Sequence, residues 1–155
     1  MTTKVYLDFG GIKSTTSDQN HKGWIEMDSF VFDLNRKFTQ TTGSSNRHLT
    51  KPEFSSIKMT KKLNAATQDI FKQASGGNGV DTCTIHLVGD KGTFMEYKLH
   101  KAVITHYTIA LYEGGSEPHE SIEINYSRID TRHIPSEAGS SPKNAGYDIE
   151  VGQVL

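Results

Sequence analysis

The sequence predicts a mostly β protein: one antiparallel domain with a single helix, built as a small β-barrel or as two packed sheets. Its 155 residues fit one domain. The 16 Thr, 12 Ile and 7 Val greatly outnumber the 8 Leu and 7 Ala, and β-branched side chains favour strands over helices. Apolar and polar residues also alternate along most of the chain, which is typical of strands with one buried face.

The first half of the chain begins with two predicted strands. Residues 4–9 alternate regularly up to a glycine pair, and residues 24–34 form the next apolar segment. In this second segment the apolar parity changes near Asp28 and Ser29, which predicts a β-bulge there. A second β-bulge would explain a similar change of parity within residues 121–134.

A long loop and the helix follow. Residues 35–52 are rich in Thr, Ser and Gly and show no periodicity, so we expect a loop of a length that is usually functional or disordered. A strand is predicted from residue 57, and the helix at about residues 64–75. Asn64 or Thr67 is its expected N-cap, and a glycine pair ends it.

The second half predicts further strands joined by short connections. A Gly-Asp-Lys-Gly turn predicts a hairpin, and residues 136–155 read as a polar linker followed by a short terminal strand. The whole chain, residues 1–155, therefore forms one domain of seven or eight strands. The predicted strands of this half are residues 80–88, 93–99, 102–112 and 121–134.

Composition excludes several classes of function. Cys83 is the only cysteine, so neither an intrachain disulfide nor a thiolate metal cage is possible. The first residues lack the apolar run of a signal peptide, and no segment approaches the roughly 18 apolar residues of a membrane span. We therefore expect synthesis in the cytosol, no membrane insertion, and no classical signal if the protein leaves the cell.

No motif for catalysis, metals or cofactors stands out. The seven histidines do not occur at ligand spacing, so scattered surface or sheet histidines are the better interpretation. Cys83 lies in an alternating strand, where a small buried hydrophobe is expected. The glycines at 76–79 follow the helix and do not precede one, which favours a helix end over a phosphate-binding loop. We expect no cofactor and no metal.

The distribution of charge is more informative than the net charge of −1. Residues 35–62 hold seven basic residues against Glu53 alone, and the rest of the chain is acidic. A basic surface facing acidic ones suits head-to-tail self-association; the alternative is a solvated basic loop. Nucleic-acid binding is a weaker third interpretation, because Phe38 and Phe54 are the only aromatics in the stretch.

A series of segments in a fixed order carries a resemblance over nearly the whole chain, although no single one of them is specific. The segments are Val5–Phe9, His21–Glu26, Phe30–Phe32, Ile57–Lys61, the helix after Asn64, Met95–Leu99, Val103–Tyr107, Glu120–Tyr126, Ile129–Pro135 and Gly146–Ile149. In this order they resemble the Hcp proteins, which form the inner tube of bacterial type VI secretion systems. The chain departs from the usual pattern in two places: Val31 replaces a small polar residue, and His106-Tyr107 replaces smaller ones.

The resemblance implies a structural protein and not an enzyme. Six copies would close into a ring, rings would stack head-to-tail into a hollow tube, and the tube would carry effectors in its lumen. Its partners would be further copies of itself, the spike and sheath proteins, and the effectors. It would leave the bacterial cytoplasm through the secretion system without a signal peptide.

The resemblance also assigns two sets of candidate site residues. The loop at 35–52 corresponds to the segment that mediates ring stacking in the family. If Phe30 and Phe32 point into the core, Val31 and, beyond the bulge, Ser29 point the other way and become candidate lumen and cargo contacts. The candidate stacking residues are Arg36, Lys37, Arg47, His48 and Lys51.

Two other classes of function remain open at this point. One is a monomeric β-sandwich that binds a carbohydrate or peptide, with Tyr6 and Trp24 as possible contacts. The other is an enzyme whose residues come from distant strands, although no spacing in the sequence supports it.

Overall fold

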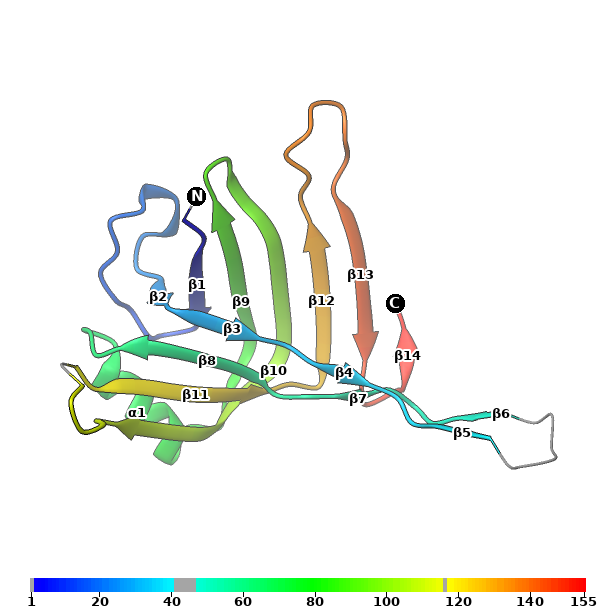
Figure 1. Cartoon of the computed structure of the whole chain (residues 1–155), viewed down its shortest axis with the longest axis horizontal. Helices are drawn as coiled ribbons and strands as arrows, with labels where there is room; N and C mark the ends of the chain where they lie inside the picture. The colour runs from blue at the N-terminus through cyan, green and yellow to red at the C-terminus, as the bar shows by residue number, and fades with distance from the viewer. Residues whose placement is uncertain (1, 41–46, 116) are drawn as a thin grey trace.

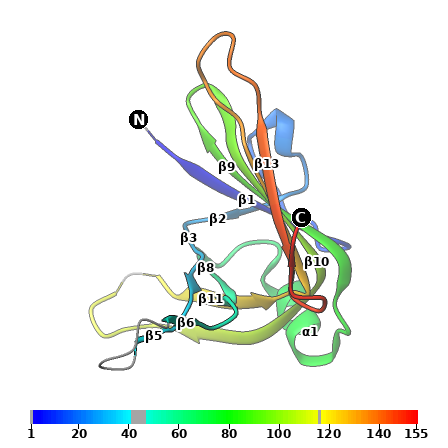
Figure 2. The same cartoon turned by 90° about the vertical axis from the view of Figure 1, so that its right-hand side faces the viewer.

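The structure is a computed structural model that describes residues 2–40, 47–115 and 117–155. Two antiparallel β-sheets share one long bent strand, β10, and the helix α1 packs against it. Figure 1 shows one sheet upright and the other running across below it. Figure 2 shows the two sheets from the side, at a steep angle to each other. A mostly β fold of two sheets with one helix is thus confirmed.

Sheet A is the upright sheet. Its strand order is β2–β1–β9–β10–β12–β13–β14, and every neighbouring pair is antiparallel. The strands are β1 (Lys4–Phe9), β2 (Ile25–Met27), β9 (Val80–Gly89), β10 (Gly92–Ala110), β12 (Arg128–His133), β13 (Lys143–Asp148) and β14 (Gln153–Val154).

Sheet B is the transverse sheet, with the order β10–β11–β8–β3, again antiparallel throughout. Two short ladders, β4 with β7 and β5 with β6, continue from it into a projecting hairpin (Figure 1). The remaining elements are β3 (Ser29–Val31), β4 (Leu34–Asn35), β5 (Phe38–Gln40), β6 (Arg47–Leu49), β7 (Glu53–Phe54), β8 (Ile57–Lys62), β11 (His119–Asn125), the 3-10 turn η1 (Gln19–His21) and α1 (Thr67–Gly76).

The predicted changes of parity lie where the chain passes from one sheet to the other. β2 pairs with β1 in sheet A, β3 pairs with β8 in sheet B, and Asp28 separates them. β11 pairs in sheet B and β12 in sheet A, and residues 126 and 127 separate them. The long strand β10 also changes sheets: it pairs with β12 up to His100, with β9 up to Ala102, and with β11 from Val103 onward. At this bend Lys101 has a φ of 52°, the left-handed region that non-glycine residues seldom adopt. The predicted bulges are therefore corners between sheets.

The sheet is not closed into a barrel, so the barrel form of the prediction is wrong and the two-sheet form holds. The reason lies in β12, which pairs with the first half of β10 only. β12, β13 and β14 therefore extend sheet A beyond the bend and do not return toward β3.

Two predicted loops contain strands. Within residues 35–52 the chain forms the β5–β6 hairpin, although residues 41–46 lie outside the described part. Within residues 136–155 the terminal strand pairing begins at Lys143, earlier than expected, and continues as β14. In both segments backbone pairing forms without apolar alternation, so periodicity gave no signal.

The core lies between the two sheets and under α1. Sheet A contributes Leu7, Phe9 and Ile85, and sheet B contributes Met59 and Ile122, all fully or almost fully buried. Burying each such side chain stabilises the fold by about 1.5–3 kcal/mol.

The helix is one turn shorter at its start than predicted. The Asn64 side chain accepts a hydrogen bond from the Ala66 N–H at 2.9 Å, and the Thr67 hydroxyl accepts one from the Asn64 N–H at 2.9 Å. The prediction of Asn64 or Thr67 as N-cap is nevertheless wrong, because the N-cap is Ala66, which makes no side-chain cap hydrogen bond. Asn64 and Thr67 instead stabilise the turn that leads into α1. The end is as expected, since the Gly77 N–H caps the Gln73 carbonyl at 3.0 Å.

Candidate functional site

The side chains of sheet B that point away from the core form one polar surface, here called the open face. It exists because each strand alternates, so that Ile57 and Met59 face the core while Lys58 and Thr60 face outward. A shallow hollow of about 370 Å³ lies on it. The open face consists of Ser29, Val31, Lys58, Thr60, His106, Thr108, Ser121 and Glu123.

The structure places both predicted cargo residues on the open face. Phe30 packs inward against Tyr97, with ring centroids 4.8 Å apart, so its neighbours Ser29 and Val31 face outward. The Ser29 hydroxyl lies 2.5 Å from the Thr60 hydroxyl. Val31 is 53% exposed, an apolar side chain on a polar surface.

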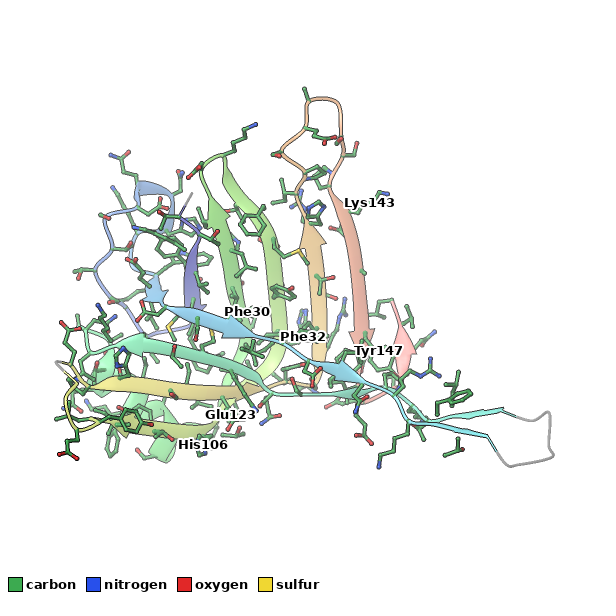
Figure 3. All side chains as sticks on the ribbon, in the orientation of Figure 1. Phe30, Phe32, His106, Glu123, Lys143 and Tyr147 are labelled. Carbon is green, nitrogen blue, oxygen red and sulfur yellow. The ribbon has the colours of Figure 1, made fainter. Side chains whose placement is uncertain are left out.

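The other half of the open face brings His106 of β10 beside Glu123 of β11. The Glu123 carboxylate accepts a hydrogen bond from the Ser56 hydroxyl at 2.6 Å. Nδ1 of His106 lies 3.9 Å from Glu123 Oε2, and its Nε2 lies 2.8 Å from the Thr108 hydroxyl. Figure 3 shows His106 and Glu123 close together. His106 thus holds a defined place opposite a carboxylate.

Sheet B has two unpaired edges. Among the described strands, β3 pairs with β8 alone, and the outer half of β10, residues 103–110, pairs with β11 alone. Unpaired edges are sites where another chain can add a strand. Large apolar side chains are exposed at or just beyond both edges: Val31 and Leu34 at one, and Ile109, Leu111 and Tyr112 at the other.

The predicted stacking residues belong to the projecting β5–β6 hairpin and its base. The Arg36 Nε donates to the Thr50 carbonyl at 3.0 Å, and the Lys37 N–H donates to the Thr50 hydroxyl at 2.9 Å. Arg36, Lys37 and Lys51 are exposed. Arg47 and His48 lie in β6, and the structure describes only their backbone pairing with β5.

Acidic residues occupy the opposite end of sheet B. The turn between β10 and β11 lies at the far end from the hairpin (Figure 1) and carries the exposed Glu113 and Glu117. Glu117 makes an exposed ion pair with Lys62 at 3.4 Å. The hairpin end therefore presents basic side chains, and the opposite end presents two carboxylates, one of them paired with Lys62.

A buried ion pair inside sheet B joins Lys61 of β8 to Glu120 of β11, and both side chains are almost completely inaccessible. The Lys61 ammonium also donates to Asn64 Oδ1 at 2.9 Å and Thr67 Oγ1 at 3.2 Å. The Tyr107 hydroxyl donates to Glu120 Oε1 at 2.7 Å. This cluster fixes the start of α1 to sheet B. The sequence patterns did not predict this cluster, although Lys61 and Glu120 both stand on the apolar parity of their strands.

The tyrosine of this cluster is held neutral. Burial, reinforced by the hydrogen bond to the Glu120 carboxylate, raises the pKa of Tyr107 to about 12. The Tyr107 hydroxyl is used inside the fold. Its packing against Phe71 of α1, with ring centroids 6.0 Å apart, serves the same attachment.

A second polar cluster, here called the histidine clasp, lies on the outer side of sheet A. It runs from Asp18 through His21 and His86 to Glu96, joining the loop before β2 to β9 and β10. Tyr6 stacks on the His21 ring at 4.5 Å between centroids. The interpretation of all histidines as scattered is therefore wrong for this pair, which lies 65 residues apart in sequence.

The clasp also accounts for the aromatic residues considered for ligand binding. Tyr6 is only 1% exposed. Trp24 packs against both histidine rings, with centroids 4.9 Å from His21 and 4.6 Å from His86. Both aromatics therefore serve packing.

The described residues give no metal centre, since no three His, Cys, Asp or Glu side chains among them are placed to hold an ion. Cys83 is completely buried, and this burial strongly raises the pKa of its thiol, so it is a neutral core residue as predicted. None of the described helices is long and apolar enough to cross a membrane.

The fold matches solved proteins of bacterial secretion. One, described as the structure of a type six secretion system protein, has a TM-score of 0.89 at 20% identity and covers 99% of this chain and 100% of its own. Hcp1 from Salmonella typhimurium has a TM-score of 0.82 at 17% identity, with full coverage of both chains. Hcp3 from Pseudomonas aeruginosa has a TM-score of 0.60 at 12% identity, covering 95% of this chain and 98% of that one. The fold is therefore that of type VI secretion proteins.

The family itself is established by sequence. The family model for the type VI secretion system effector Hcp matches residues 6–133, most of the chain. The protein belongs to the Hcp family, whose members are structural tube proteins secreted by type VI systems. A search of curated proteins finds no match.

Proposed function

We propose that this chain is the tube subunit of a type VI secretion system, assembling as six-membered rings that stack head-to-tail and carry effectors in their lumen. Membership of the Hcp family supports the tube. The observation that carries the ring is the pair of unpaired edges on sheet B. On this proposal the protein acts as structure and carrier and has no enzymatic activity.

The edges are compatible with ring closure. Because all pairs in sheet B are antiparallel, β3 and the outer half of β10 run in opposite directions. A neighbour related by rotation about an axis along the strands therefore brings its β3 beside this β10 in antiparallel orientation. Every copy uses both edges, so a ring leaves neither edge without a partner strand.

Stacking follows from the charges at the two ends of sheet B. The basic hairpin with Arg36, Lys37 and Lys51 would face the acidic turn with Glu113 and Glu117 of the next ring. Opposite charges at opposite ends fix a head-to-tail orientation, because reversing one ring brings like charges together. Arg47 and His48 remain candidate stacking residues on the same hairpin.

The open face would line the lumen. When the copies of sheet B join through their edges, they form a closed wall around a channel. One face of each sheet then lies on the outside of the ring, and the other face lines the channel. The core and sheet A cover one face, so the other, with Ser29 and Val31, faces the channel. Effectors would contact this face, the tube would meet the spike and the sheath, and export from the bacterial cytoplasm would need no signal peptide.

Light scattering combined with negative-stain microscopy tests the ring. We expect particles of six subunits with a central hole. A monodisperse monomer over a wide range of protein concentrations would contradict the proposed ring.

Charge reversal tests the stacking contact separately. Changing Arg36 and Lys37 to Glu should abolish stacking and leave single rings intact, and reversing Glu113 and Glu117 to Lys in the same chain should restore it. Added salt should weaken wild-type stacking, because the charges are exposed. Failure of the double reversal to restore stacking contradicts the pairing of these two ends. Reversal of Lys91, on the β9–β10 turn of sheet A, is the matched control.

A further inference from the structure

The projecting β5–β6 hairpin stands on a two-stranded ribbon that leaves sheet B. Among the described residues, β4 pairs only with β7 and β5 only with β6, so no third strand fixes the direction of this ribbon. A two-stranded ribbon has little stability of its own in water and relies on packing against other elements. The direction in which the hairpin projects therefore depends on side-chain contacts at its base.

The ribbon leaves sheet B at a bulge. Val31 pairs with Lys58 and Leu34 pairs with Phe54, so a step of three residues, from 31 to 34, lies opposite a step of four, from 58 to 54. The extra residue lies between Phe54 and Lys58. Because a bulge bends its strand and interrupts the ladder, the ribbon can change direction here.

Tyr126 fixes the ribbon at this bulge. Its hydroxyl donates to the Ser55 carbonyl at 2.8 Å, from the corner where the chain passes from β11 to β12. Burial raises the pKa of Tyr126 to about 12, so the hydroxyl keeps its proton at ordinary pH. A single fixed point still allows the ribbon to swing about it.

Tyr147 supplies a second point, from the last strands of sheet A. Its ring lies against that of Phe54 in β7, with centroids 4.8 Å apart and planes inclined by 28°. The Phe54 ring also lies 6.1 Å from that of Phe32, between centroids. Figure 1 shows the end of β13 reaching the base of the hairpin. Aromatic pairs in such arrangements attract each other beyond the area that they bury.

The support behind Tyr147 is itself attached to sheet A. Tyr147 is paired on both sides, with β12 and with β14. The turn that follows is tied to the corner between the sheets, because the Ile149 N–H donates to the Ser127 carbonyl at 2.8 Å. This turn also lies against a candidate stacking residue, since a Cβ at Gly152 would be 3.5 Å from Nζ of Lys51. The end of sheet A therefore supports the base of the hairpin.

We propose that Tyr147 is a positioning residue for ring stacking, because its ring holds Phe54 and so sets the direction in which the hairpin leaves the subunit. This inference rests on the proposed stacking role of the hairpin. Two contacts from different elements, at Ser55 and at Phe54, fix a direction that either alone leaves free. A hairpin already held in one direction loses less conformational freedom when it meets the next ring, which favours association.

A distance measurement between two spin labels tests the positioning itself. The labels are attached at Thr39→Cys on β5 and Lys98→Cys on β10, both exposed positions, and labelled subunits are diluted with excess unlabelled wild type. Cys83 is completely buried and stays unlabelled. We expect a narrow distance distribution for the parent and a clearly broader one after Tyr147→Ala. Tyr147→Phe, which keeps the ring, and Ile149→Ala, which changes an exposed side chain of the same turn, should leave it narrow.

Analytical ultracentrifugation of unlabelled rings tests the consequence for stacking. Tyr147→Ala should weaken ring association about five-fold for each hairpin in contact, as expected for the loss of one aromatic pair, and leave the rings intact. Tyr147→Phe should stack like the wild type. The inference is overturned if Tyr147→Ala leaves the distance distribution narrow, or if the distribution broadens and stacking is unchanged. If wild-type rings do not stack, the proposed function fails, whereas the distance distribution still shows whether Tyr147 holds the hairpin.

Phe54→Ala provides a second route if Tyr147→Ala fails to fold, because it removes the other half of the same contact. It should broaden the distribution at least as much as Tyr147→Ala does. A chain that carries both changes should be no broader than Phe54→Ala alone, since the two residues act through one contact. Additive broadening would show that they act independently and would overturn the inference.

Discussion

The buried ion pair and the histidine clasp are both polar clusters with little exposure, but they differ in what they join. Lys61 and Glu120 lie opposite each other on adjacent strands of sheet B and fix the start of α1 to them. His21 and His86 lie 65 residues apart in sequence and hold the loop before β2 on sheet A. Burial alone therefore does not determine the role of a polar cluster: one attaches a helix to neighbouring strands, and the other attaches a loop to a distant sheet.

The largest loss in the free energy of unfolding is expected when the ion pair between Lys61 and Glu120 is broken. Lys61→Met leaves the Glu120 carboxylate buried without its cation, and we expect a loss of about 3–5 kcal/mol in the free energy of unfolding. Replacing Glu120 by Leu in the same chain should recover more than half of that loss. Urea denaturation at neutral pH measures both. A loss below about 1 kcal/mol for the single variant contradicts the interpretation.

A smaller effect is expected at the tyrosine of the same cluster. Tyr107→Phe should lower the free energy of unfolding by about 1–3 kcal/mol, since the Glu120 carboxylate loses a donor. The raised pKa, about 12, means that Tyr107 stabilises the fold below pH 10 and that this contribution is lost as the pH rises through 12. The variant should lose this alkaline decline. Urea midpoints at pH 8 and pH 11 check the difference, and an unchanged decline would count against it.

The smallest effect concerns the acidic end of the clasp. Because its pKa is lowered, Asp18 stabilises the fold above its unfolded-state pKa, and this contribution disappears as the pH falls through the folded value. Asp18→Asn should therefore narrow the difference in melting temperature between pH 7 and pH 3. Asp90→Asn, on the exposed β9–β10 turn, is the control. Equal changes in both variants would show that the clasp makes no special use of Asp18.

Local patterns predicted the sheets better than the places where they meet. Alternation identified the buried faces of β1, β8, β9 and β11, because a strand with one face in the core alternates apolar and polar residues along its sequence. The change of parity at Asp28 was detected but read as a bulge. Only pairing partners distant in sequence distinguish a bulge from a corner, and these are absent from a local pattern.

In the candidate site, too, local patterns predicted some residues, whereas contacts between distant segments could not be predicted. The outward parity of Ser29 and Val31 followed from Phe30, and the basic segment containing Arg36 and Lys37 followed from counting charges. Lys61 and Glu120 stood on apolar parities and could have been paired on that signal. The clasp could not, since His21 and His86 meet only through the packing of a loop on sheet A, and the unpaired edges depend on the strand order of the whole sheet.

The strand shared by the two sheets has a consequence for how the protein unfolds. β10 supplies backbone hydrogen bonds to β9 and β12 with one half and to β11 with the other. Melting either sheet thus removes a neighbour from a strand that the other sheet needs, and the core between them loses one wall. We therefore expect the two sheets to unfold as one cooperative unit in a single transition.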